Sequence, residues 1–264
     1  MIRPKAPMKN KKFIVLLVLL ACVLGLGFWF DQQHSTAVVM YHNIAANPQN
    51  YNDTVSPQTF QAQLEYFKAQ GYHVLRFSDL VGMMKAGKKL PRKTLVLTFD
   101  DGYENNFLQA FPLLKQYGLT ATFFISAGKV GQPGFMNWKE LSALQQGGMD
   151  IGAHGMGHVY LPQVPDVVQN YEITESKKQI EARLKNRVDI FSYPVGGFNE
   201  NIKRLVMQAG YQGAATTNRG AHFRNDDIYA IRRIKLTDKD VSAFNLWRKC
   251  SGYYYLFQKP KKPH

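Results

Sequence analysis

The 264-residue sequence predicts an α/β fold of the barrel type, with one transmembrane helix near its amino-terminal end. After residue 37, short apolar segments alternate with amphipathic ones, which is typical of parallel strands joined by crossover helices. The strand candidates number seven or eight, which suits a closed barrel. Residues 13–30 form an uncharged, mostly apolar run that approaches the ~20 residues of a membrane-spanning helix.

The amino-terminal segment predicts export of the rest of the chain. Five basic residues precede the apolar run and should stay in the cytoplasm: Arg3, Lys5, Lys9, Lys11 and Lys12. We therefore assign residues 1–12 as a cytoplasmic basic segment, 13–30 as a transmembrane anchor or uncleaved signal, and 31–37 as a linker. A cleaved signal peptide is the alternative, because Ser35-Thr36-Ala37 resembles a cleavage site. We favour the anchor, since the run is long and its aromatic end suits a membrane interface.

Eight segments after the anchor are predicted as strands from their apolar content. They are residues 37–41, 73–77, 94–99, 120–126, 149–153, 188–192, 213–216 and 228–234.

The segments between these strands carry helix signals. Ser56 and Pro57 offer a cap and a first helical residue. Ser78 is expected to cap a helix over 79–85, and Pro112 predicts a kink or a late start in the segment 105–117. Further helices are expected over 137–146 and 166–187. Residues 38–258 are expected to form one domain, followed by a basic tail over 259–264.

Charge and cysteine content limit the partners. The formal net charge is +14, and residues 1–37 contribute five positive charges and one negative charge, so most of the excess lies on the exported part. A basic exported domain is attracted to anionic cell-wall polymers or lipid headgroups, and the export signal argues against nucleic acid. Cys22 in the apolar run and Cys250 near the C-terminus are not expected to pair, so stability must come from the core.

Two polar clusters follow predicted strands. Asp100 and Asp101 come after 94–99, and His154 and His158 come after 149–153. In a barrel of parallel strands these positions share one rim. An Asp-Asp-Gly sequence alone is an ordinary turn, but a buried carboxylate at a strand end needs a partner. With a carboxylate, the two histidines would form a three-ligand Zn²⁺ site with open positions.

Three motifs, in this order and spacing, resemble the first three motifs of the polysaccharide deacetylases with a NodB-homology domain, carbohydrate esterase family four. They are Thr98-Phe99-Asp100-Asp101-Gly102, the His154 and His158 pair, and Phe191-Ser192-Tyr193-Pro194-Val195-Gly196. The resemblance covers essentially everything after the anchor. It implies a distorted (β/α)7-type barrel and metal-dependent removal of N-acetyl groups from sugars.

The resemblance also implies roles for individual residues. Asp101, His154 and His158 would bind a divalent metal, with Zn²⁺ favoured over other divalent transition metals, and Asp100 would be the catalytic base. The backbone N–H of Val195 would donate to the oxyanion. Candidate substrate contacts are Tyr193, Pro194 and Trp138; for Trp138, core packing is an equal alternative.

The sequence departs from the family pattern at three places. No histidine of the late Leu-x-His type is present, but Tyr41-His42 resembles the permuted subgroup that deacetylates poly-N-acetylglucosamine, so His42 is our candidate acid. A structural role for His42, with His222 as the acid, is the alternative. Ser192 stands where an orienting arginine is common, so Arg232 or Arg233 is expected to replace it. Gly155 replaces the common Ser or Thr after the first histidine.

The function predicted is that of a single-pass membrane protein whose extracellular domain deacetylates an N-acetylglucosamine polymer, of the poly-N-acetylglucosamine type. A cleaved secreted form is the alternative for its location. Peptidoglycan, chitooligosaccharides and O-acetylated xylan-like chains are alternative substrates. A catalytically silent glycan-binding protein of the same fold is the hypothesis of a different class.

Overall fold

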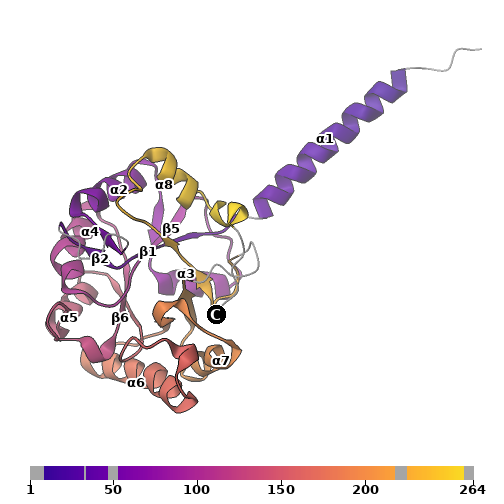
Figure 1. Cartoon of the computed structure of the whole chain (residues 1–264). Helices are drawn as coiled ribbons and strands as arrows, with labels where there is room; N and C mark the ends of the chain where they lie inside the picture. The colour runs from indigo at the N-terminus through magenta and orange to yellow at the C-terminus, as the bar shows by residue number, and fades with distance from the viewer. Residues whose placement is uncertain (1–8, 33, 47–52, 218–224, 259–264) are drawn as a thin grey trace, which may run out of the picture. The chain divides into compact units, whose positions relative to one another are not determined.

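The computed structural model describes residues 9–32, 34–46, 53–217 and 225–258, and the chain divides into two compact units, Met1–His34 and Ser35–His264 (Figure 1). In the first unit, α1 (Lys9–Gln32) contains one stretch, Phe13–Asp31, that is long and apolar enough to cross a membrane or to serve as a signal sequence. The large apolar side chains between Phe13 and Phe30 are exposed. Two features considered above, His222 and the tail over 259–264, lie outside the described residues.

The second unit is built on one parallel sheet, which has nine strands within the described residues. The order is β10-β9-β8-β7-β6-β5-β1-β11, and β4 pairs with β5. The strands are β1 (Ala37–Tyr41), β4 (His73–Leu75), β5 (Thr94–Phe99), β6 (Thr122–Ile125), β7 (Asp150–Ala153), β8 (Ile190–Ser192), β9 (Gly213–Thr216), β10 (Ile231–Arg232) and β11 (Ile234–Lys235). A separate two-stranded sheet joins β2 (Asn43–Ile44) and β3 (Thr54–Val55).

The sheet curves into the nearly closed α/β barrel that the sequence predicts. Its two edge strands, β10 and β11, are separated in the chain by Arg233 alone. The prediction of one strand over 228–234 is therefore wrong. The chain first pairs with β9 as β10 and, after Arg233, pairs with β1 as β11. The strand is therefore interrupted at the point where the barrel closes.

The helices follow the predicted signals with one correction. Ser56 Oγ accepts the N–H of Thr59 and caps α2 (Pro57–Ala69). The prediction that Ser78 caps the next helix is wrong, because α3 (Phe77–Lys85) begins one residue before it. Instead, the Ser78 N–H donates to the carboxylate of Asp150 at 3.1 Å.

The remaining helices are mostly short. The predicted interruption at Pro112 is confirmed, since a π-helical turn (Asn106–Ala110) runs into α4 (Phe111–Tyr117), which has a proline in its first turn. Asn137 and Glu140 form a capping box at α5 (Trp138–Gln146). The others are α6 (Asp166–Leu184), α7 (Glu200–Gln208), α8 (Ala243–Cys250) and 3₁₀ turns at Ala127–Lys129, Leu161–Gln163, Pro194–Gly196 and Tyr254–Phe257.

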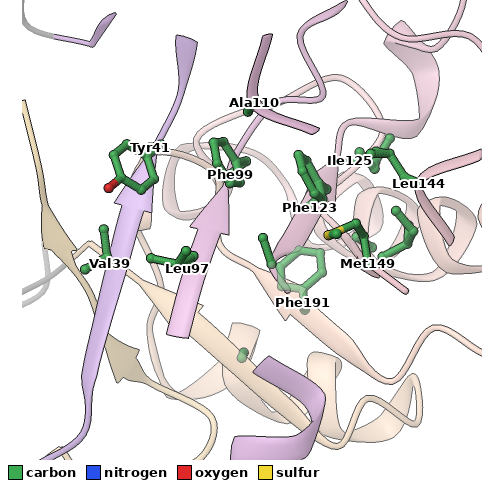
Figure 2. Packing of buried hydrophobic residues seen from close by; sticks show 14 of the residues in the cluster. Val39, Tyr41, Leu97, Phe99, Ala110, Phe123, Ile125, Leu144, Met149 and Phe191 are labelled. Carbon is green, nitrogen blue, oxygen red and sulfur yellow. The ribbon is translucent and has the colours of Figure 1, made fainter. Parts of the chain in front are cut away.

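The two faces of the sheet are packed differently. Odd-numbered residues of β1, β5, β6, β7 and β8 belong to the larger cluster, which packs against the surrounding helices. Figure 2 labels ten members of this cluster: Val39, Tyr41, Leu97, Phe99, Ala110, Phe123, Ile125, Leu144, Met149 and Phe191. On the other, enclosed face, Val38, Val96 and Phe124 pack against α3. Toward the carboxyl ends this enclosed face becomes polar, with Thr98, Asp100, Ser192 and Arg233 buried. The polar end is where the predicted site residues lie.

Candidate active site

A cavity of about 930 Å³ opens at the carboxyl ends of the strands. Six of the predicted site residues line it: His42, Asp100, Asp101, His154, His158 and Val195. They follow β1, β5, β7 and β8, four strands from separate parts of the sequence. The other lining residues are Met40, Asn43, Ala45, Asp53, Thr54, Tyr103, Asn105, Pro133, Gly134, Phe135, Thr217 and Lys235.

Three of the non-glycine lining residues have left-handed backbone conformations, which residues other than glycine rarely adopt. The φ angles are 73° at Asp101, 60° at His158 and 58° at Val195. Such conformations are strained, most of all for a β-branched residue, and they cluster at functional sites. At Asp101 the turn is very tight, since Gly102 N–H donates to the Asp100 carbonyl at 2.9 Å. This turn lets two consecutive carboxylates reach one cavity.

Asp101, His154 and His158 converge on one point. The Nε2 atoms of His154 and His158 lie 3.5 and 3.0 Å from Asp101 Oδ1. His154 Nδ1 lies 2.7 Å from the Ser192 carbonyl, which can only accept, so Nδ1 carries the proton and the Nε2 lone pair faces Asp101. Burial opposes ionisation of Asp101, but the hydrogen bonds and positive charges of the two imidazoles, when these are protonated, outweigh burial and hold its pKa well below the usual range.

This arrangement fits a metal ion. Asp101 Oδ1 is buried and has no hydrogen-bond donor among the residues that the structure describes. A carboxylate oxygen and an imidazole lone pair facing each other repel unless a cation lies between them. The ligand atoms all lie within 4.8 Å of one another, and the two contacts above are close to the roughly 3.3 Å that separates two ligands of a tetrahedral Zn²⁺.

Asp100 has a different environment from its neighbour. Arg233 Nη1 and Nη2 donate to its two carboxylate oxygens, each at 2.6 Å, and the Ser192 hydroxyl lies at 3.5 Å. Burial raises the pKa of the Asp100 carboxyl, but the charge and hydrogen bonds of Arg233 together with the charges of His154 and His42 outweigh burial and lower it. Asp100 is therefore ionised at neutral pH.

Of the two arginines considered, Arg233 is the one that contacts Asp100. Its Nη2 also donates to Ser192 Oγ at 2.9 Å. Ser192, which stands where an arginine is common in the family, therefore helps to hold Arg233 in place. Arg232 lies elsewhere, with its guanidinium 4.3 Å from the centre of the Tyr255 ring. Arg232 ends β10, and Arg233 is the residue at which the chain passes from β10 to β11.

His42 directly follows β1 and lines the same cavity. Burial lowers its pKa, although the negative charges of Asp100 and Asp101 oppose the shift. Its Nδ1 atom is buried and has no hydrogen-bond partner within the described part of the chain. An imidazole with an unpaired nitrogen beside two carboxylates is suited to proton transfer.

The structure does not bring three predicted substrate contacts to the cavity. Tyr193 is 0% exposed; its hydroxyl donates to the Tyr229 carbonyl and its ring stacks on Phe198, so the prediction that its side chain binds substrate is wrong. Pro194 is buried beside it. Trp138 borders a second cavity of about 510 Å³, where Arg183 lies 5.9 Å from its ring centre.

Several cavity residues were missed by the sequence reasoning. Tyr103 stacks on Phe135 with ring centres 5.2 Å apart, and burial together with the charge of Asp101 raises the pKa of Tyr103 to about 12. Asn105 Nδ2 donates to Asn43 Oδ1 at 2.9 Å. Tyr103 could have been found from its place after the Asp-Asp-Gly motif. Phe135 carries no such signal.

Comparisons with known proteins agree with this fold. The polysaccharide deacetylase profile matches residues 87–214. YxkH of Bacillus subtilis (strain 168) is 30% identical over 200 residues, which cover 76% of this chain and 71% of that protein. The poly-beta-1,6-N-acetyl-D-glucosamine N-deacetylase of Staphylococcus aureus (strain MRSA252) is 26% identical over 218 residues, covering 77% and 74%.

Two solved structures share the architecture. The Streptococcus pyogenes deacetylase PplD, solved with acetate, superposes with a TM-score of 0.76 at 26% identity, covering 81% of this chain and 97% of that one. IcaB from Ammonifex degensii has a TM-score of 0.71 at 21% identity, covering 82% and 97%, and shows the same fold. The chain therefore belongs to the polysaccharide deacetylase family, that is, to carbohydrate esterase family four with its NodB-homology domain.

Proposed function

We propose that this polysaccharide deacetylase is a metal-dependent enzyme that removes N-acetyl groups from an extracellular polymer of N-acetylglucosamine, of the poly-N-acetylglucosamine type. The observation that carries the proposal is the convergence of Asp101, His154 and His158 beside the ionised Asp100. The choice of polymer is supported by the Staphylococcus aureus relatives, whose names specify poly-beta-1,6-N-acetyl-D-glucosamine and which match 77% of this chain.

The metal site is assigned to Asp101, His154 and His158, with Zn²⁺ as the expected ion, since two imidazoles and one carboxylate with open positions suit catalytic zinc. When bound, the ion lowers the pKa of a coordinated water and polarises the acetamide carbonyl.

The remaining roles concern protons and the developing negative charge. Asp100 accepts the proton of the attacking water, and Arg233 keeps the carboxylate ionised and oriented through two hydrogen bonds. Val195 lines the cavity in a left-handed backbone conformation with a φ of 58°, which supports its N–H as the oxyanion donor. His42 delivers a proton to the amine nitrogen as the C–N bond breaks.

The proposed cellular location of the chain is inferred from the first unit. Residues 1–12 lie in the cytoplasm, 13–30 cross the membrane, and after the linker 31–37 the domain 38–258 lies outside the cell. The exposed apolar stretch of α1 supports this proposal. The basic domain and the tail over 259–264 favour contact with anionic cell-wall polymers. Retention of the full-length chain in washed membranes would support an anchor, whereas a shortened form in the medium would support cleavage.

The decisive experiment measures acetate release from poly-N-acetylglucosamine, peptidoglycan and chitooligosaccharides with Zn²⁺ and after chelation. We expect metal-dependent release, fastest from poly-N-acetylglucosamine. Asp100→Asn should lower kcat by about 10²–10⁴-fold, the range for loss of a general base, while Zn²⁺ stays bound. If no acetylated glycan yields metal-dependent acetate, the chain is a silent glycan-binding protein of this fold.

The acid role of His42 has its own prediction. His42→Ala should keep Zn²⁺ binding and lose about 10²–10⁴-fold in turnover of the amide, because the amine leaves poorly without a proton. An activated aryl acetate, whose leaving group needs no proton, should be hydrolysed by this variant at nearly the wild-type rate. Full amide turnover in His42→Ala would move the acid role to His222 or to solvent.

A further inference from the structure

The loop between His154 and His158 is held from both sides. Its carbonyls are bound by the turn after β6, since Ala127 N–H donates to the Gly155 carbonyl at 2.9 Å and Gly128 N–H to the Met156 carbonyl at 3.0 Å. Its N–H groups face the other way, toward α6. There they meet the side chain of Glu172.

Glu172 is buried, with 5% of its surface exposed. Its Oε2 accepts the N–H of Met156 at 2.7 Å and the N–H of Gly157 at 2.9 Å, and Oε1 lies 3.2 Å from the same Gly157 nitrogen. Hydrogen bonds to an ionised acceptor are shorter and stronger than neutral ones. One carboxylate from α6 therefore fixes two successive peptide groups of the loop.

The glycines of the His-Gly-Met-Gly-His motif provide the space for this carboxylate. A Cβ atom at Gly155 would lie 2.7 Å from Glu172 Oε2, and one at Gly157 would lie 3.3 Å from Oε1. Gly155 also has a φ of 73°, which favours glycine. The departure at Gly155 from the common Ser or Thr thus has a physical reason, because the carboxylate lies where a side chain would begin.

We propose that Glu172 is a positioning residue for the metal site. By holding the peptide groups of Met156 and Gly157, it sets the turn that points the Nε2 atoms of His154 and His158 at Asp101. It contacts neither substrate nor the reacting atoms. The inference rests on the assignment of Asp101, His154 and His158 as metal ligands in the proposed function.

The test is the affinity of the full-length protein for Zn²⁺ alone, measured by competition with a chromophoric chelator. Glu172→Ala leaves both N–H groups without their acceptor, and the affinity should fall about 10–100-fold, as is usual when a group that orients metal ligands is lost. Glu172→Gln keeps one acceptor oxygen at nearly the same volume but loses the charge, so a loss of about three- to tenfold is expected. The absorption spectrum of bound Co²⁺ should change in both variants.

Ser176→Ala is the matched control. Ser176 is buried one turn further along α6, and its hydroxyl donates to the Ile173 carbonyl rather than to the loop. This variant should lose some thermal stability but keep its Zn²⁺ affinity and Co²⁺ spectrum.

Two results would overturn the proposal. One is a Zn²⁺ affinity of the folded Glu172→Ala variant within about twofold of wild type. If that variant does not fold, an unchanged affinity in the isosteric Glu172→Gln variant has the same force. The other is an equal loss of affinity in Ser176→Ala. Because Zn²⁺ binding requires no substrate, failure to deacetylate any glycan would refute the proposed function and leave this inference standing.

Discussion

Two aspartates at opposite ends of the same sheet have opposite environments. Asp100 lies just past the carboxyl end of β5, and Asp150 begins β7 at the amino end. Asp100 receives two hydrogen bonds from the Arg233 guanidinium, and its pKa is lowered despite burial. Asp150 receives the Ser78 N–H at 3.1 Å and the Thr122 hydroxyl at 3.3 Å, and burial raises its pKa.

The difference teaches that the partner, and not burial alone, decides what a buried carboxyl can do. Asp150 is held by uncharged donors and serves as an acceptor at the start of α3. Asp100 is kept charged by a fully buried guanidinium. A buried ion pair is weak evidence for stability, because removing two charges from water is expensive. The pair of Asp100 and Arg233 is therefore better explained by the proposed role of Asp100, as an ionised base beside the proposed metal ligands, than by stabilisation.

The largest effect is expected from Arg233→Ala. This change leaves Asp100 buried without its cation, which typically destabilises a protein by about 3–5 kcal/mol. For a domain of this size such a loss corresponds to a fall in Tm of roughly 10 °C, which thermal unfolding followed by circular dichroism would detect. A Tm unchanged from wild type would show that Asp100 does not depend on this partner.

A smaller effect is expected from Arg233→Lys, which keeps the charge but loses the paired hydrogen bonds. The pKa of Asp100 should rise toward its ordinary value. In the wild type, the base function is lost as pH falls through the lowered pKa, so the acid limb of kcat/KM should move to higher pH in this variant. The measurement is kcat/KM between about pH 4 and 7.

Arg232→Lys is the control for that profile, since Arg232 lies over Tyr255 and not at Asp100. Its acid limb should coincide with that of the wild type. A shift of equal size in both variants would mean that the loss of the paired hydrogen bonds to Asp100 is not what moves the acid limb.

The sequence was sufficient for those parts of the fold and site that are local in the chain. The bounds of β1, β5 and β9 follow from apolar runs, and Asp100, Asp101, His154 and His158 line one cavity because the carboxyl ends of parallel strands meet at one rim. The expectation that Asp101 lies past the strand end also agrees with its tight turn.

Features that depend on distant pairing could not be predicted. Arg232 and Arg233 are equivalent in the sequence, and only the break between β10 and β11 at the barrel closure decides which one contacts Asp100. Tyr193 is of a residue type that often contacts sugars, yet its side chain lies in the core. Glu172 looks like any charged residue of a polar helix, because its hydrogen bonds to the histidine loop cross from one element to another.

The smallest effect is expected from Asp150→Asn. The folded-state pKa of Asp150 is raised above its unfolded value of about 4, so its contribution to stability is fully present below that pH and is lost as pH rises through the folded value. Asparagine stays neutral, and its side-chain oxygen can still accept the Ser78 N–H. The variant should therefore lack this pH-dependent loss and, near pH 7, match or slightly exceed the wild-type Tm, within about 3 °C.

Turnover should be unchanged in Asp150→Asn, because the residue lies at the end of the sheet opposite the cavity, whereas the same substitution at Asp100 should remove most activity. Asp79→Asn controls for the loss of a surface charge on α3, where Asp79 pairs with Arg76 at 2.8 Å, a contact worth no more than about 1 kcal/mol. A large fall in Tm at neutral pH for Asp150→Asn alone would mean that Asp150 acts as a charged cap. Asp150 and Asp100 would then both be charged, and they would differ in their position within the barrel and not in their ionisation.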